Sequence, residues 1–161
     1  MKIGIVSDTH DNLEKTERIV DFLEDRVEKV IHCGDVVAPF TAELFDADFD
    51  FYAVRGNNDG EWKLMETVEE FGTYLGQSGE IEFDGVKFGV YHGTREEIAD
   101  AMTRSGKYDY VLRGHTHQKK VREHGETVEL NPGGIAIEGA GEPIHVIVMD
   151  TRTDELEFHE V

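Results

Sequence analysis

Residues 2–10 read Lys-Ile-Gly-Ile-Val-Ser-Asp-Thr-His, a short apolar run that ends abruptly in polar side chains. The run Lys2–Val6 is typical of a buried strand, and Asp8 and His10 follow directly after it. Residues i and i+2 of an extended segment point the same way, so Asp8 and His10 can present two groups to one site. The stretch therefore predicts a strand whose carboxyl end carries a polar site.

Strands and helices alternate after this opening. Asp11 and Glu14 predict a capping box at the start of a helix. The buried face of that helix is expected to hold Leu13, Thr16, Val20, Leu23 and Val27. Further predicted elements are the strands Lys29–Cys33 and Phe49–Val54 and a short helix Pro39–Phe45. This β-α-β-α-β order favours a parallel sheet with helices packed on it.

The second half is richer in hairpins. Predicted strand pairs are Gly79–Phe83 with Val86–Tyr91 across Asp84-Gly85, Lys119–Glu123 with Thr127–Leu130 across His124-Gly125, and Pro143–Met149 with Glu155–Val161. A capping box at Thr94 and Glu97 opens a helix that ends near Gly106, and Tyr108–Leu112 is a further strand. Together the halves predict an α/β fold of two mixed sheets packed face to face with helices outside, in one domain over residues 1–161.

The charge is strongly acidic. Thirty-five acidic residues against sixteen basic ones give a net charge of −19, which repels polyanions and makes long nucleic acid an unlikely partner. Two explanations stay open: an ordinary acidic protein, or adaptation to high salt, where dense ions screen self-repulsion.

The compartment and membrane relations follow from smaller signals. The only cysteine is Cys33, so an intrachain disulfide is impossible and a reducing compartment fits. The first apolar run is too short for a signal peptide, and no run approaches the roughly 20 apolar residues of a membrane-spanning helix. We expect a cytoplasmic protein without a membrane partner.

Five short polar clusters each follow a predicted strand, where ligands gather in open α/β sheets. They are Asp8-Thr-His10, Gly34-Asp35, Gly56-Asn57-Asn58-Asp59, His92-Gly93 and Gly114-His115-Thr116-His117. Carboxylate, amide and imidazole ligands together suit borderline divalent metals such as Mn²⁺, Fe²⁺, Ni²⁺ or Zn²⁺. The sequence has no thiolate cluster, so a structural zinc site of the cysteine type is excluded.

These five motifs in this order, D-x-H, G-D, G-N-x-D, H-G and G-H-x-H, resemble the calcineurin-like metallophosphoesterase superfamily, and most of all its compact archaeal and bacterial phosphodiesterases. The resemblance spans Asp8 to His117 and implies an αββα four-layer sandwich with two divalent metals, most often Mn²⁺, with Ni²⁺, Zn²⁺, Fe²⁺ or Mg²⁺ as alternatives. It implies a metal-bridging Asp35, one metal on Asp8, His10 and His117, and the other on Asn57, His92 and His115. The implied reaction is in-line attack by an activated water on the phosphorus of a small phosphodiester.

One position departs from the family pattern. Many relatives carry histidine where this chain has Asn58, and an amide donates hydrogen bonds but supplies no proton at neutral pH. We therefore expect slow hydrolysis of esters with poor leaving groups, with Asn58 contacting the phosphate and Asp59 as one alternative proton source. Asp59 can equally form only an Asx turn.

Other interpretations stay beside this one. A non-catalytic scaffold resembling the family's retromer subunit, a phosphomonoesterase and a nuclease are the alternatives, and homo-oligomers are common among relatives of this size. His32 is expected to order a loop rather than bind metal, and Asn12 to cap a helix rather than line the pocket. Trp62 and Phe71 are expected in the core or an oligomer contact rather than under a substrate.

Overall fold

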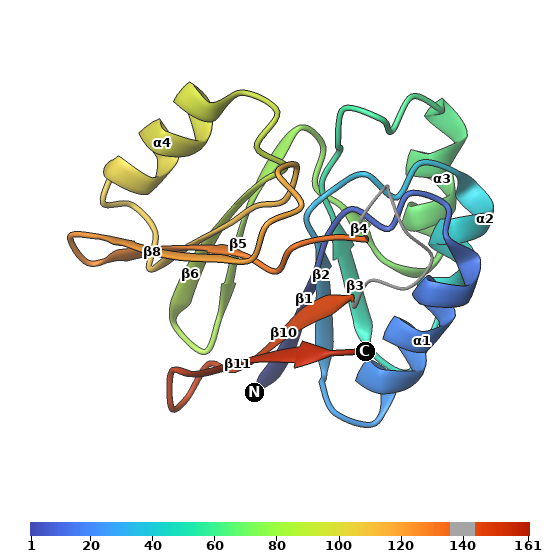
Figure 1. Cartoon of the computed structure of the whole chain (residues 1–161), viewed down its shortest axis with the longest axis horizontal. Helices are drawn as coiled ribbons and strands as arrows, with labels where there is room; N and C mark the ends of the chain where they lie inside the picture. Colours follow the sequence, from blue (N-terminus) through green and yellow to red (C-terminus); the bar gives the residue numbers. More distant parts are fainter. Residues whose placement is uncertain (136–143) are drawn as a thin grey trace.

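The computed structural model describes residues 1–135 and 144–161, which form two mixed β-sheets (Figure 1). The six-stranded sheet holds, in spatial order, β11 (Glu155–Glu160), β10 (His145–Asp150), β1 (Lys2–Val6), β2 (Lys29–His32), β3 (Asp50–Ala53) and β4 (Thr73–Tyr74). The five-stranded sheet holds β5 (Ser78–Phe83), β6 (Val86–Tyr91), β7 (Tyr110–Leu112), β9 (Thr127–Asn131) and β8 (Lys120–His124). In each sheet, parallel inner strands are extended by antiparallel pairs at the edge.

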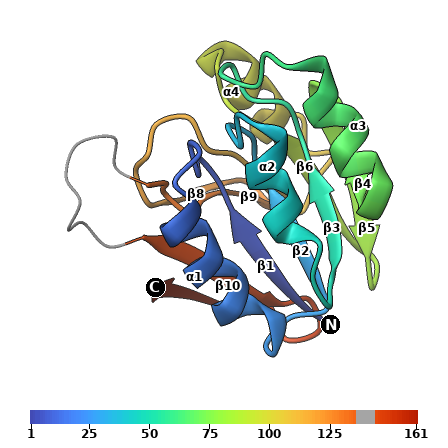
Figure 2. The ribbon, with the colours of Figure 1, turned by 90° about the vertical axis from the view of Figure 1, so that its right-hand side faces the viewer.

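Helices cover the outer faces of both sheets. The six-stranded sheet is covered by α1 (Leu13–Glu24), α2 (Pro39–Ala42, continued by a 3₁₀ turn at Glu43–Phe45) and α3 (Trp62–Phe71), as Figure 2 shows. The five-stranded sheet is covered by α4 (Glu96–Arg104) (Figure 1). The predicted αββα sandwich is therefore confirmed. Among the described residues, none of the helices has the length and apolar character needed to cross a membrane.

Two apolar cores follow from the alternation of side chains along β1. Ile3 and Ile5 face the other sheet and join a core between the sheets, whereas Val6 packs in the core under the helices. Gly4 lies on the helix side, where a Cβ atom would come within 3.0 Å of Leu23. The absent side chain thus lets α1 approach the sheet closely, which fixes the position of the loop that follows β1.

The predicted start of α1 was wrong by one residue. The Oδ1 atom of Asn12, not Asp11, accepts the capping hydrogen bond from the Lys15 backbone N–H at 3.1 Å, as the alternative for Asn12 anticipated. Asp11 instead accepts hydrogen bonds from the Ala38 backbone N–H and the Thr41 hydroxyl at the start of α2. Leu13, predicted on the buried face, is 42% exposed because the helix begins with it at the rim of the sheet.

Other local predictions also differ from the structure. Arg95, not Thr94, precedes α4 and offers no side-chain capping bond, so the Thr94–Glu97 capping box was wrong. The β8–β9 turn is Gly125-Glu126 rather than His124-Gly125, because His124 still pairs with Thr127. The two-residue strand β4 was missed. Pro143, the predicted start of the strand before Met149, lies outside the described residues, and β10 begins at His145.

Candidate metal centre

All five polar clusters meet at one edge of the sandwich. β1, β2 and β3 run parallel in one sheet, and β6 and β7 run parallel in the other. Each cluster follows the carboxyl end of one of these strands, so the loops converge. Backbone hydrogen bonds tie the first two loops together, from Asp8 N to Gly34 O at 3.0 Å and from His10 N to Asp35 O at 3.1 Å.

Asp8 lies at the buried centre of the cluster. Its Oδ2 atom accepts hydrogen bonds from the Ser7 hydroxyl at 2.5 Å and from the His115 backbone N–H at 3.0 Å. Its Oδ1 atom is buried and has no hydrogen-bond partner among the described residues. Burial opposes ionisation of this carboxyl, but His10, His92 and Ser7 outweigh it, so the pKa of Asp8 lies below its ordinary value.

Three imidazole Nε2 atoms surround that Oδ1 atom. The distances are 3.4 Å from His117, 3.7 Å from His10 and 3.9 Å from His92. The rings of His10 and His117 stack with centroids 5.0 Å apart. Four possible metal ligand atoms, one of them a carboxylate oxygen, thus lie close together without forming a closed hydrogen-bond network among themselves.

Asp35 faces Asp8 from the loop after β2. Its Oδ2 atom lies 3.2 Å from His92 Nε2 and 3.6 Å from His10 Nε2. Burial opposes ionisation, but the contacts with His92 and Asn58 outweigh it and hold the pKa of Asp35 well below its usual range. A carboxylate kept ionised between two imidazoles suits the metal-bridging position that the family resemblance implies for it.

The backbone sets the tautomers of two rings. His92 Nδ1 lies 2.8 Å from the Cys33 carbonyl, and His117 Nδ1 lies 3.0 Å from the Ile135 carbonyl. A carbonyl only accepts, so each Nδ1 donates and each Nε2 keeps its lone pair for the cluster. Hydrogen bonding of the distal ring nitrogen to a carbonyl is the usual arrangement of metal-binding histidines.

The backbone of the loops is strained at several of the predicted metal-ligand residues. Positive φ angles occur at Asp8 (56°), Asp35 (60°), His10 (45°), His115 (68°) and His117 (55°). Non-glycine residues adopt this left-handed conformation at a cost of order 1–3 kcal/mol each, and such residues gather at functional sites. Five of them in one cluster indicate that side-chain placement there outweighs local backbone preference.

The two other predicted ligands lie beside the cluster. Asn57 Oδ1 is 3.1 Å from His92 Nε2 and accepts a hydrogen bond from the Thr94 hydroxyl at 3.4 Å. The His115 ring packs edge-on against His92 with centroids 5.2 Å apart, and burial beside His92 lowers its pKa. All seven predicted ligands therefore come from the same edge.

Asn58 and Asp59, predicted to act on the substrate, both form hydrogen bonds with the loop of Asp35. Asn58 donates two hydrogen bonds to Asp35, from its backbone N–H and from its side-chain amide, each 2.8 Å long. Asp59 is buried and accepts backbone hydrogen bonds from Asp35 at 3.0 Å, Val37 at 2.7 Å and Gly56 at 2.6 Å. Both side chains thus hold the Asp35 loop in place, and Asp59 does so from beneath it.

The residues fit a pair of divalent cations. The ligand atoms of Asp8, His10 and His117 lie within 4.8 Å of one another, and so do those of Asp8, Asp35 and His92. Two atoms of this set, Asp8 Oδ1 and His10 Nε2, are buried and find no hydrogen-bond partner within residues 1–135 and 144–161, which is costly unless a cation satisfies them. Carboxylates with imidazoles and no thiolate suit Mn²⁺, Fe²⁺, Ni²⁺ or Zn²⁺.

Sequence reasoning missed the supports behind the ligands. Arg113 is only 1% exposed, forms ion pairs with Glu96 at 2.7 Å and Glu129 at 3.9 Å, and donates to the Gly93 carbonyl at 3.3 Å. It thereby anchors the loop of His92 to the sheet from below. The only signal in the sequence is its place before Gly114. His32 orders its loop as expected, because its Nδ1 atom accepts from Gly34 N and its Nε2 atom contacts the Thr9 hydroxyl, each at 3.1 Å.

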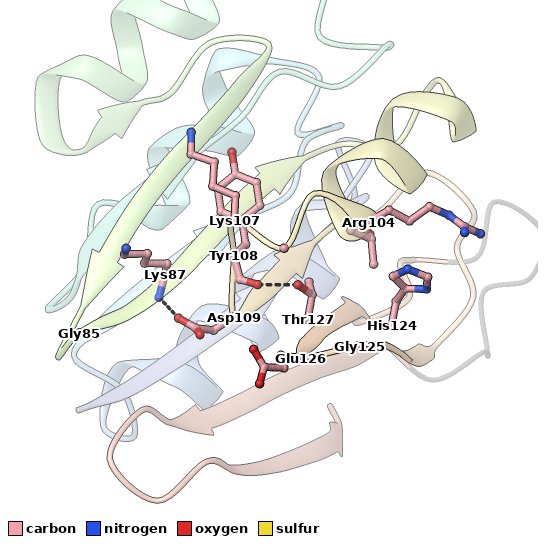
Figure 3. A pocket seen from close by; sticks show the side chains of 12 residues that line it. Gly85, Lys87, Arg104, Lys107, Tyr108, Asp109, His124, Gly125, Glu126 and Thr127 are labelled. Carbon is pink, nitrogen blue, oxygen red and sulfur yellow. Dashed lines mark hydrogen bonds between the residues drawn. The ribbon is translucent and has the colours of Figure 1, made fainter.

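The cavities of the molecule differ in their relation to the cluster. One of about 480 Å³, lined by Lys87, Arg104, Lys107 and His124 among others, lies where β6 and β9 begin and contains no residue of the five clusters (Figure 3). Another, of about 520 Å³, is bordered by Gly56, Asn57 and Thr94 and so adjoins the metal centre. The second cavity is therefore the one relevant to chemistry at the cluster.

The family follows from comparison with known proteins. The family model described as the calcineurin-like phosphoesterase superfamily domain matches residues 1–154, and the chain belongs to this superfamily. The chain is 36% identical, over 96% of each chain, to phosphodiesterase MJ0936 of Methanocaldococcus jannaschii. It is 26% identical to phosphodiesterase YfcE of Escherichia coli K12, over 93% of this chain and 88% of that one.

Solved structures agree on the fold. A structure described as a novel archaeal phosphodiesterase superposes with a TM-score of 0.92 at 34% identity, with all of both chains covered. Vps29 of Entamoeba histolytica, solved with Zn²⁺, superposes with a TM-score of 0.72 at 17% identity, over 100% of this chain and 98% of that one. At that lower identity the likeness concerns the fold alone.

Proposed function

We propose that this chain is a binuclear metal-dependent phosphodiesterase that hydrolyses small phosphodiesters. The observation that carries the proposal is the cluster of carboxylate and imidazole atoms around the partnerless Asp8 Oδ1 atom. Similarity to two proteins named phosphodiesterases supports the reaction class. The complete ligand set argues against the scaffold alternative, since an interaction module does not require one.

The proposed ligands form two sets, one for each cation, and Asp35 belongs to both. Asp8, His10 and His117 hold one cation, and Asn57, His92 and His115 hold the other. Asp35 contributes to both, because its Oδ2 atom lies near both His10 and His92. When bound, two divalent cations activate water as a nucleophile and neutralise charge that develops on the phosphoryl oxygens.

The proposal also covers the metal, the substrate, the compartment and the oligomeric state. The expected metal is Mn²⁺, with Ni²⁺, Zn²⁺, Fe²⁺ or Mg²⁺ as substitutes. The net charge of −19 disfavours long nucleic acid, so the substrate is a small ester, and the protein acts in the cytoplasm. A homo-oligomer is compatible with the exposed apolar side chains on α2 and α3.

Asn58 sets a limit on the leaving group. The side-chain amide of Asn58 donates a hydrogen bond to Asp35 and cannot supply a proton to the leaving group. Alkoxide leaving groups therefore depart poorly, whereas aryl oxides depart without a proton donor. We expect p-nitrophenyl diesters to react at least about a hundredfold faster than dialkyl diesters, the typical scale of general acid catalysis. Side-by-side initial rates on methyl p-nitrophenyl phosphate and dimethyl phosphate measure this, and comparable rates would show that another group supplies the proton.

The direct test is hydrolysis of bis(p-nitrophenyl) phosphate by chelator-stripped protein with Mn²⁺, Ni²⁺, Zn²⁺ or Mg²⁺ added back. The expected result is activity that requires a metal and disappears in Asp35→Asn. Folded protein without activity under any of these metals would reject the proposed function and favour the scaffold.

A further inference from the structure

A strip of surface runs from Asn57 at the metal centre past Arg55 to Trp62 on α3. This strip carries an exposed tryptophan beside a cation. Trp62, the first residue of α3, is 71% exposed, so it lies outside the core, and the other expectation for it, an oligomer contact, stays a prediction. It lines a cavity of about 350 Å³ together with Arg55, Met65, Tyr74 and Gln77. This cavity also includes Asp59 and Gly60, so it lies directly behind the loop that carries Asn57.

Arg55 joins this cavity to the metal centre. It follows β3 and also lines the cavity of about 520 Å³ that borders Asn57 and Thr94. The side chain is fixed, because its Nε atom donates to the Asp59 carbonyl at 2.9 Å and its backbone N–H donates to Gly76 O at 2.7 Å. Within residues 1–135 and 144–161, its guanidinium forms no ion pair with a carboxylate.

The charge of this strip differs from that of the whole molecule. Acidic residues outnumber basic ones by 35 to 16, yet the described lining of the larger cavity includes Arg55 and Arg95, the latter paired with Glu97, and no acidic side chain. In the Trp62 cavity, the Asp59 carboxylate is occupied by three backbone N–H groups, and Glu61 is the other acid. The larger cavity is therefore the part of the strip that favours an anion, whereas the Trp62 cavity, with two acids beside Arg55, suits an uncharged ring.

We propose that Trp62 and Arg55 form a subsite for the aromatic arm of a nucleotide phosphodiester, with the base stacked on the Trp62 indole and Arg55 facing its phosphate. This rests on the proposed function, since the phosphoryl group that the subsite positions is the one held at the metal centre. Stacking of bases on exposed aromatic rings, with an arginine nearby, is how proteins bind nucleotides without reading their sequence. The partly buried Tyr74 closes the cavity on the β4 side.

The chain offers a direct reporter, because Trp62 is its only tryptophan. Titration of the metal-free protein with thymidine 5′-monophosphate is expected to quench its fluorescence saturably, whereas ribose 5-phosphate, which lacks the base, leaves it unchanged. N-acetyltryptophanamide titrated in parallel corrects for absorbed light. In Arg55→Gln the dissociation constant for the nucleotide should rise at least about fivefold, the scale of one lost charged contact.

Kinetics give the second readout. Thymidine 5′-p-nitrophenyl phosphate and methyl p-nitrophenyl phosphate share a leaving group and differ only in the other arm. Trp62→Ala should lower kcat/KM for the nucleoside ester more than for the methyl ester, by about fivefold to a hundredfold, and Trp62→Phe should restore most of it. Phe40→Ala, an exposed aromatic on α2 that lines neither cavity, is the matched control.

Each outcome decides the proposal. Absence of quenching by the nucleotide, or equal losses for both esters in Trp62→Ala, would overturn the subsite. Fluorescence that instead depends on protein concentration, with a dimer in sedimentation, would assign Trp62 to an interface between copies. Because quenching requires no turnover, nucleotide binding in a protein that hydrolyses nothing would reject the proposed function and leave the subsite standing.

Discussion

At the scale of single residues, burial decides which polar groups carry chemistry. Asp8, His32 and Asp59 are all buried polar residues near the cluster, yet of these three only Asp8 has a side-chain polar atom without a hydrogen-bond partner in the described part of the chain. The other two are saturated by backbone groups and a hydroxyl. Of the six buried side-chain polar atoms without a hydrogen-bond partner among the described residues, two belong to the cluster, Asp8 Oδ1 and His10 Nε2, and the other four belong to Arg113, Arg122 and Glu129.

The buried His32 side chain should make the folded protein less stable in acid. Burial lowers its pKa to about 3, so the folded protein keeps it neutral, while the unfolded chain binds a proton near 6.5. The stability due to the neutral ring is complete above pH 6.5 and is lost as pH falls from there toward 3, by up to about 1.4 kcal/mol per pH unit.

Urea unfolding of metal-free protein between pH 7 and pH 4 measures this. His32→Asn keeps an acceptor for the Gly34 N–H and should flatten the decline by up to one proton, although it lowers stability at pH 7. His124→Gln, at an exposed position, is the control and should keep the original slope. An unchanged slope in His32→Asn would place the acid sensitivity elsewhere.

The sequence predicted residue types better than residue roles. The ligand positions followed from strand ends carrying metal-binding side chains, and the structure brings all seven to one edge. The roles of Asp59, Asn58 and Arg113 depend on which backbone groups face them across loops distant in sequence. No local pattern encodes those contacts.

At the scale of elements, the loops after β1, β2, β3 and β7 fit together with almost no free space. A Cβ atom on Gly114 would lie 1.8 Å from the Ser7 hydroxyl and 2.4 Å from Asp8 Oδ2. One on Gly56 would lie 2.1 Å from Asp35 Oδ1. These glycines therefore allow one loop to pass directly over the carboxylate of another.

Gly114→Ala should consequently disrupt the metal centre, because the added methyl group displaces Asp8 from its imidazole neighbours. We expect affinity for Mn²⁺ to fall at least about tenfold, the lower end of the effect of losing support behind a ligand. Isothermal titration with Mn²⁺ and a far-UV spectrum measure affinity and fold separately.

Gly60→Ala is the matched control, since a Cβ there meets nothing within 4 Å and Gly60 needs no positive φ. Equal Mn²⁺ affinity in Gly114→Ala and Gly60→Ala would mean that the loops adapt and that the close packing has no part in holding Asp8.

Helix starts were the weakest element predictions for a physical reason. Asp11, Asn12 and Thr94 all have side chains that can cap a helix, and the sequence does not distinguish among them. The loop after β1 turns through positive φ angles at His10 and Asp11, which moves the cap to Asn12 and sends Asp11 to α2. Tertiary demands of the metal centre thus override the local capping preference.

At the scale of the whole molecule, the net charge of −19 predicts a salt-dependent fold. Self-repulsion among exposed carboxylates weakens as the screening length falls from about 10 Å at 0.1 M salt to about 3 Å at 1 M. We expect the midpoint of thermal unfolding to rise by several degrees between low salt and 1 M KCl. Adaptation to high salt, one of the two explanations for the acidic composition, requires such a rise.

The same scan at pH 5, near the isoelectric point of about 4.6, is the control, because the net charge and hence the salt effect shrink there. A midpoint that ignores salt at neutral pH, together with full activity in dilute buffer, would favour an ordinary acidic protein.

We propose that one edge of the sandwich binds two divalent cations, with Asp35 between them. Equilibrium dialysis of chelator-stripped protein against Mn²⁺, followed by elemental analysis, tests it most directly. We expect two Mn²⁺ per chain, and fewer in Asp35→Asn at the same free Mn²⁺ concentration. Two Mn²⁺ retained with unchanged affinity in Asp35→Asn, or none bound by the folded wild-type chain, would contradict it.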